Sequence, residues 1–129
     1  MEGSQFDDAA LDLIKSGKIV YGGYSAALAI VGPDLFGSEI VDNPYDVPVG
    51  YDDLTPPTSA LGLLDYYIAP HYMTDMPWEQ DVLNYVEYMR KNGRKIVCMR
   101  DGEVHIIDQT NSSLDDLIQT VELQEELHE

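Results

Sequence analysis

The sequence predicts an α/β fold with a mainly parallel sheet. Stretches with helical spacing of apolar residues alternate with short, apolar, β-rich runs, and one such run passes through two glycines into a small-residue helix. The chain has 129 residues, of which 44% are apolar, so one domain spanning residues 1–129 with a modest core is expected. In a parallel sheet, the loops that follow the strands carry the functional groups.

The N-terminal half is predicted to contain a helix, a strand and a second helix. Residues 4–16 have helical spacing, residues 18–22 resemble a buried strand, and residues 26–31 form a short helix that ends before Gly32-Pro33. Residues 34–59 form a long loop with four prolines and many aspartates. A loop of this length in a compact domain is usually functional or mobile.

The C-terminal half is predicted to begin with a buried strand over residues 66–69, which Pro70 stops. A helix over residues 77–92 follows, with Val82, Tyr85, Val86 and Met89 on one face. Strands 95–99 and 104–107 are expected to form a hairpin around the turn Asp101-Gly102, and residues 109–129 a helical tail.

The formal net charge of −17 makes nucleic acids and anionic membranes poor partners. No run approaches the roughly 20 apolar residues of a membrane span, and the N-terminus does not resemble a signal peptide. The single cysteine, Cys98, is expected to be an inert core thiol, which leaves no internal disulfide. A cytoplasmic location is therefore expected.

Ser25 lies where the predicted strand meets the short helix, in a pattern close to G-x-S-x-G. Gly23 takes the first glycine position and Ala27 the last. This pattern is typical of a nucleophile elbow, a strained turn that exposes a serine hydroxyl. A serine hydroxyl becomes an effective nucleophile only when a base accepts its proton.

His71 is the candidate base, because it directly follows the strand that Pro70 ends. His105 falls within the expected hairpin, and His128 falls in the tail. For a third, orienting carboxylate the long loop offers Glu39 and Asp42 first, then Asp46, Asp52 and Asp53. Each of these residues also has a purely structural interpretation. Ser25 could be an ordinary turn residue, His71 a packed or capping residue, and the acids solvated charges of the loop.

The sequence predicts no metal site, because neither the acids of the long loop nor the histidines have ligand-like spacing. Met73, Met76 and Trp78 follow His71. Partial core packing is the preferred interpretation for them, with a substrate groove as the alternative.

Four segments together resemble the peptidase E family: residues 21–27 around the serine, Gly32-Pro33, residues 42–44, and residues 61–72 with the block Asp-Tyr-Tyr-Ile-Ala-Pro-His-Tyr. These are serine dipeptidases, typically cleaving after an N-terminal aspartate, on a class I glutamine amidotransferase-like fold. The ending, from Lys91-Asn92-Gly93 through residues 100–104, also resembles the closing helix and hairpin of the family. The resemblance covers residues 4–108 and corresponds to the C-terminal half of the family.

The resemblance implies a partial doubly wound sheet, with Ser25 as the nucleophile and His71 as the general base. It implies that an acid after the nucleophile helix, Glu39 or Asp42, completes the site, and that the N–H of Ala26 donates to the oxyanion. It implies short peptides as substrates and no cofactor. A glutamine amidotransferase is disfavoured, because that chemistry uses a cysteine at the elbow.

A sheet that lacks the family's N-terminal half would expose an apolar edge. We therefore expect a homo-oligomer or a partner chain that supplies the missing half, with activity complete only in that assembly. The alternative is a non-catalytic homologue that acts as a binding or scaffolding subunit.

Overall fold

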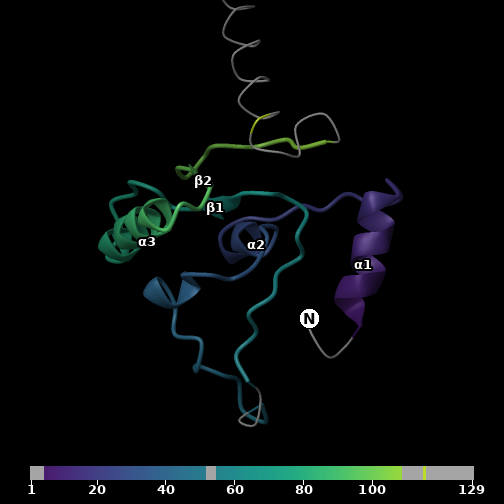
Figure 1. Ribbon diagram of the computed structural model, residues 1–129, viewed down its shortest axis with the longest axis horizontal. Coiled ribbons are helices and arrows are strands. Elements are labelled where there is room, and N and C mark those ends of the chain that lie inside the picture. Colours follow the sequence, from purple (N-terminus) through teal and green to yellow (C-terminus); the bar gives the residue numbers. More distant parts are fainter. Residues whose placement is uncertain (1–4, 52–54, 109–114, 116–129) are drawn as a thin grey trace, which may run out of the picture.

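The computed structural model describes residues 5–51, 55–108 and 115. Its elements lie in the order helix, helix, short 3₁₀ helix, strand, helix, strand (Figure 1). Their bounds are α1 Phe6–Lys15, α2 Ala26–Ala29, η1 Ser38–Ile40, β1 Tyr67–Ala69, α3 Glu79–Lys91 and β2 Ile96–Cys98.

Strands β1 and β2 form a parallel pair, in which Tyr67 faces Ile96 and Ala69 faces Cys98. The side chains on the two faces of β1 belong to two separate clusters of buried residues. Tyr67 and Ala69 pack against α3, whereas Ile68 packs in a cluster that includes Leu28 of α2. A parallel strand is normally covered on both faces, which explains why β1 is apolar throughout. The predicted α/β class with parallel pairing is confirmed, while the described pair is too small to test the larger doubly wound sheet.

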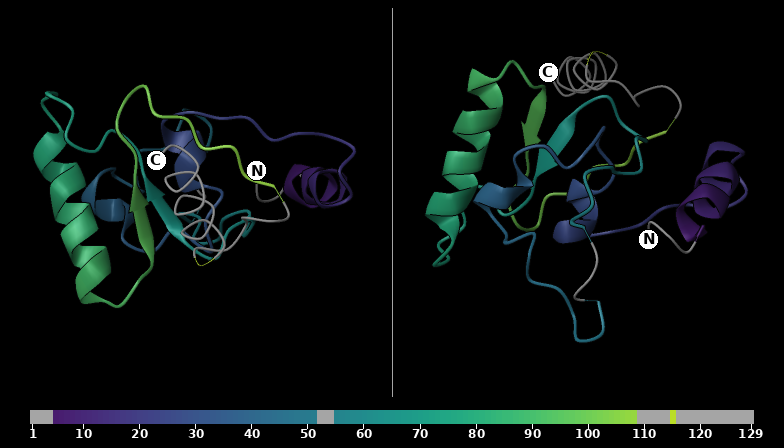
Figure 2. Two further views of the ribbon diagram at one scale, coloured as in Figure 1. Left: turned by 90° about the horizontal axis from the view of Figure 1, so that it is seen from above. Right: turned by 60° about the horizontal axis from the view of Figure 1, so that its bottom comes forward.

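Helix α3 forms because its apolar residues fall on one side. Val82, Tyr85, Val86 and Met89 are buried, as predicted, and Met89 has no exposed surface. Acidic residues occupy the first turn and basic residues the last, which matches the helix dipole. Figure 2 shows α3 beside the strand pair and α1 set apart on the opposite side of the molecule, and α1 buries none of its residues.

Two predicted strands are wrong. Residues 18–22 form no strand, and Val20 is 94% exposed rather than buried. Residues 104–107 also form no strand, so the expected hairpin is absent and β2 pairs with β1 instead. Apolar spacing alone does not make a strand, because a strand also requires backbone hydrogen bonds to a neighbouring strand, and neither segment is part of the sheet that β1 and β2 form.

Residues 34–59 are largely irregular where described, as expected, apart from η1 and one bridge between Asp34 and Ser59. The predicted C-terminal helix lies outside the described residues, except for Asp115. No helix in the described ranges is long and apolar enough to cross a membrane.

Candidate active site

Ser25 occupies a backbone conformation that side chains rarely adopt. Its φ is 55° and its ψ is −126°, just before the first residue of α2. Such a conformation costs on the order of 1–3 kcal/mol and persists only where the surroundings impose it. This strain is the structural signature of the elbow that the glycine pattern predicts.

Close packing beneath Ser25 explains the small residues around it. A Cβ atom placed on Gly23 would lie only 2.7 Å from the Cβ of Ala27, so the elbow admits a methyl group on one side of this contact but not on both. The hydroxyl of Tyr21 donates a 2.7 Å hydrogen bond to the carbonyl of Ala27. This bond ties the segment before the elbow to the helix after it.

His71 is held by the continuation of the strand pair. The N–H of Met99 donates to Ala69, and the N–H of Tyr72 donates to Met99, both at 2.9 Å. The hydroxyl of Thr74 donates to the carbonyl of His71 at 3.1 Å. His71 itself has a φ of 59°, a second strained position in the site.

The side chains of Ser25, His71 and Asp101 form a hydrogen-bonded row. The Oγ of Ser25 lies 2.9 Å from Nε2 of His71, and Nδ1 of His71 lies 2.6 Å from a carboxylate oxygen of Asp101. The structure thus brings Ser25 and His71 together, although they lie 46 positions apart in the chain. The arrangement is that of a nucleophile, a base and an orienting acid.

The acid at His71 is Asp101, and neither of the two acids expected there occupies that place. Glu39 lies on η1, where its charge faces Tyr85 of α3 and helps to raise the pKa of that tyrosine. The carboxylate of Asp42 accepts a 2.9 Å hydrogen bond from the N–H of the next residue, Asn43. Neither of these interactions involves His71.

Sequence reasoning missed Asp101 because Asp-Gly was interpreted as the turn of a hairpin. A signal for its position was nevertheless available. Asp101 follows strand β2 as His71 follows strand β1, and adjacent parallel strands bring their carboxyl ends to one edge. Of the other candidate acids, Asp46 accepts a 3.3 Å hydrogen bond from the side chain of Asn43, and Asp52 and Asp53 lie outside the described residues.

Ala26 is the first residue of α2, and the first hydrogen bonds of this helix are donated by the residues that follow it. The N–H of Ala27 donates to Tyr24, and the N–H of Leu28 donates to Ser25. Ala26 is the residue directly after Ser25, which is the position expected to donate to an oxyanion.

The surroundings of His71 are apolar and open. Trp78 lies edge-on to the imidazole, with ring centroids 6.5 Å apart. Met73, Met76 and Trp78 are 53%, 41% and 44% exposed, so each side chain is only partly packed and none belongs to the buried core. Asp101 is also exposed, with 58% of its side chain accessible against 30% for His71.

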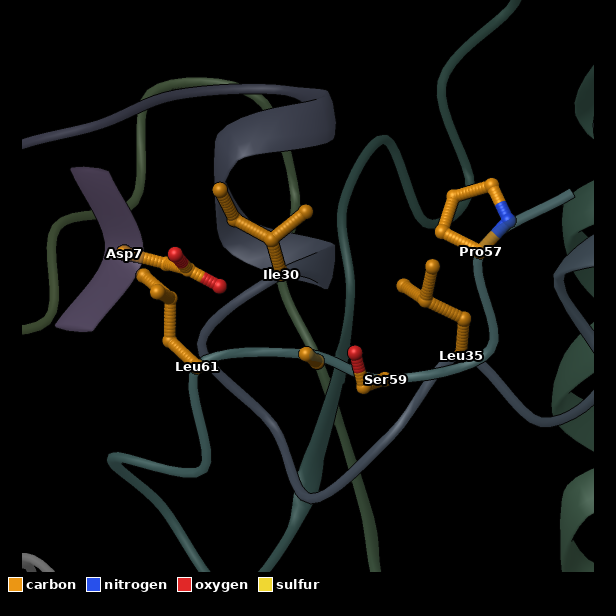
Figure 3. Close-up of a pocket in the computed structure, with 7 residues that line it drawn as sticks. Asp7, Ile30, Leu35, Pro57, Ser59 and Leu61 are labelled. Atoms are coloured by element: carbon orange, nitrogen blue, oxygen red, sulfur yellow. The ribbon is translucent and has the colours of Figure 1, made fainter. Parts of the chain in front are cut away.

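A cavity of about 170 Å³ lies elsewhere, between α1, the end of α2 and the loop before β1. Figure 3 shows Asp7 and Leu61 at one side of it and Leu35 and Pro57 at the other. Its lining contains no residue of the Ser25, His71 and Asp101 group. Across the described residues, no group of three or more acidic, histidine or cysteine side chains is arranged to hold a metal ion.

Comparison with known families agrees with this geometry. A model of peptidase family S51 matches residues 1–115, a range that contains Ser25, His71 and Asp101. The chain belongs to peptidase family S51. This is the peptidase E family, so the resemblance seen in the sequence is confirmed. No curated protein and no solved structure matches the chain.

Membership in family S51 gives the three aligned side chains a chemical context. The family is defined by peptidases, and a serine, an imidazole and a carboxylate in hydrogen-bond sequence form one of the standard arrangements for peptide hydrolysis.

Proposed function

We propose that the chain is a serine-type peptidase acting on short peptides, with Ser25 as the nucleophile, His71 as the general base and Asp101 as the acid that orients His71. The observation that carries the proposal is the continuous hydrogen-bonded line from Ser25 Oγ through both ring nitrogens of His71 to Asp101. It forms within a chain of family S51.

The geometry suits acyl transfer in two steps. With Asp101 accepting from Nδ1–H, Nε2 of His71 is free to take the proton of Ser25 as Oγ attacks the scissile carbonyl carbon. The protonated His71 then gives its proton to the leaving amine, which releases the first product and leaves an acyl-enzyme. A water molecule that gives a proton to His71 hydrolyses this ester and restores Ser25.

The N–H of Ala26 is the proposed oxyanion donor. It directly follows the nucleophile, and the hydrogen bonds of α2 begin one residue later. Loss of one such donor typically costs about 10²–10³ in rate.

By the resemblance to the peptidase E family, dipeptides with an N-terminal aspartate are the first substrates to test.

We further propose that the site is complete only in an assembly, with a second copy or a partner chain covering it. Asp101 is more than half exposed, and a charge interaction in contact with water is weak. Val20 and Tyr24, in the segment before Ser25, are 94% and 86% exposed. A covering chain would bury these apolar side chains and exclude water from the site.

The test is labelling with a fluorophosphonate, read by intact mass, beside Ser25→Ala and His71→Ala variants whose folding is checked by circular dichroism. We expect one adduct on the chain and none on either variant. If the folded chain forms no adduct at any concentration, catalysis by this chain alone is refuted, which leaves a subunit that needs a partner chain or a non-catalytic binding subunit.

A further inference from the structure

Arg100 places a cation next to the reactive residues. It precedes Asp101 directly, and its guanidinium Nη2 lies 3.5 Å from the sulfur of Met73, two residues after His71. Its backbone N–H donates to a carboxylate oxygen of Glu103 at 2.7 Å. The backbone of Arg100 is thus fixed, while its side chain extends along the His71 loop and remains exposed.

The guanidinium of Arg100 pairs with no carboxylate in the described part of the chain. The ion pairs there involve His71, Lys91 and Lys95. Arg94 lies over the ring of Phe36 instead. Among the described side chains, the guanidinium of Arg100 contacts a thioether, which is a weak acceptor, although the chain has 24 acidic side chains and only 7 basic ones.

The two acids nearest to Arg100 in sequence are occupied. Asp101 interacts with His71, and Glu103 accepts from the backbone N–H of Arg100. The donors of the Arg100 side chain therefore remain available at the edge of the site. Because the net charge of −17 disfavours the approach of anions, a cation at the site would favour the binding of an anionic peptide there.

We propose that Arg100 is a specificity-determining residue that binds a carboxylate group of the peptide at the Ser25 site. The inference rests on the proposed function for the location of the peptide. An arginine fork binds a carboxylate through two parallel hydrogen bonds, which a methionine sulfur does not match, so the peptide displaces Met73 from the guanidinium. The carboxylate is either an acidic side chain of the peptide or its free C-terminus.

Binding to the Ser25→Ala variant tests the proposal without depending on turnover. Isothermal titration calorimetry would compare Asp-Leu, Asn-Leu, Asp-Leu-amide and Asn-Leu-amide, which together separate the side-chain carboxylate from the terminal one. Arg100→Gln and Arg100→Lys would be added to this background. Arg90→Gln on α3, whose guanidinium lies 3.9 Å from the sulfur of Cys98, is the matched charge control.

We expect Arg100→Gln to weaken binding of the recognised carboxylate by about 10–100-fold, the range for a charged hydrogen bond, and Arg90→Gln to leave it within about twofold. Arg100→Lys should retain part of the affinity, because it keeps the charge and loses the fork. Peptides that lack the recognised carboxylate should bind weakly to every variant.

Equal weakening by Arg100→Gln and Arg90→Gln would overturn the proposal, as would equal affinity for all four peptides or no measurable binding of any of them. Failure of the proposed function is read separately, because it shows as an absent fluorophosphonate adduct on the chain with Ser25 intact. The uncharged probe does not need Arg100, so Arg100→Gln should label at an unchanged rate.

Discussion

At the scale of single residues, the orientation of one imidazole decides whether Ser25 can react. Asp101 accepts from Nδ1 of His71 at 2.6 Å and thereby leaves Nε2 to accept a proton from Ser25. An asparagine at this place can present an N–H to the ring and favour the wrong tautomer. Replacing one carboxylate oxygen of Asp101 by an amide nitrogen therefore tests whether Asp101 is the acid that orients His71.

We predict that Asp101→Asn slows fluorophosphonate labelling of Ser25 by up to about 10⁴-fold. Glu39→Gln and Asp42→Asn should change the rate less than about twofold, because these acids make their contacts elsewhere. The measurement is the rate of adduct formation by intact mass. A larger effect of Glu39→Gln than of Asp101→Asn would show that the acid expected from the sequence is the functional one.

The contact between Gly23 and Ala27 gives a second prediction at this scale. Gly23→Ala should destabilise the fold by about 1–3 kcal/mol, because its Cβ would lie 2.7 Å from that of Ala27. Adding Ala27→Gly removes the clash and should restore most of the loss, less about 1 kcal/mol for a glycine within a helix. Urea unfolding measures both effects. A stable Gly23→Ala single variant would mean that the elbow is not closely packed.

The sequence alone identified two of the three aligned side chains. Ser25 and His71 were predicted because both follow short apolar runs, one through paired glycines and one through Pro70. Asp101 was assigned to a turn, since a local Asp-Gly pattern does not reveal which strand lies beside β2. That information appears only when β1 and β2 pair in register.

At the scale of elements, β1 and α3 meet through two buried tyrosines whose ionisation is suppressed. Burial raises the pKa of Tyr67 to about 12, and its 2.6 Å hydrogen bond to Asp34 acts in the same direction. Burial also raises the pKa of Tyr85 to about 12. Both side chains belong to the cluster that joins the sheet to α3.

These shifts predict a loss of stability in alkali. The folded pKa values lie above the ordinary value of 10.0, so the folded state holds these protons more tightly than the unfolded state does. The resulting stabilisation is complete below pH 10 and falls as the pH rises toward 12. Unfolding in urea at a series of pH values measures it. The double variant Tyr67→Phe with Tyr85→Phe should show a flatter decline, and an unchanged slope would exclude these two tyrosines as the cause.

Elements with a strong internal pattern were predicted well, and elements that depend on a neighbour were not. Helix α3 followed from four apolar positions on one face, and β1 and β2 followed from apolar runs bounded by Pro70 and Asn92-Gly93. The segments 18–22 and 104–107 have equally suitable composition but form no strand. Composition sets the capacity to form a strand, whereas an adjacent strand is what completes its hydrogen bonds.

At the scale of the whole molecule, two features act in opposite directions on assembly. Val20, Val104 and Ile106 are each at least 79% exposed, which favours association through apolar contact. The net charge of −17 opposes the approach of a second copy. Salt screens the charge and leaves the apolar contact in place, so the two effects can be separated by ionic strength.

We predict that self-association increases with salt. Sedimentation velocity at low and high sodium chloride should show a shift from monomer toward a larger species, and Val104→Ser with Ile106→Ser should reduce it. Fluorophosphonate labelling of Ser25 should increase in parallel, because the covering chain would exclude water from the exposed His71–Asp101 pair. If the chain stays monomeric at every salt concentration yet labels well, the site needs no second copy. If the chain stays monomeric and Ser25 is labelled only when another protein chain is added, that chain supplies the surface that covers the exposed His71–Asp101 pair.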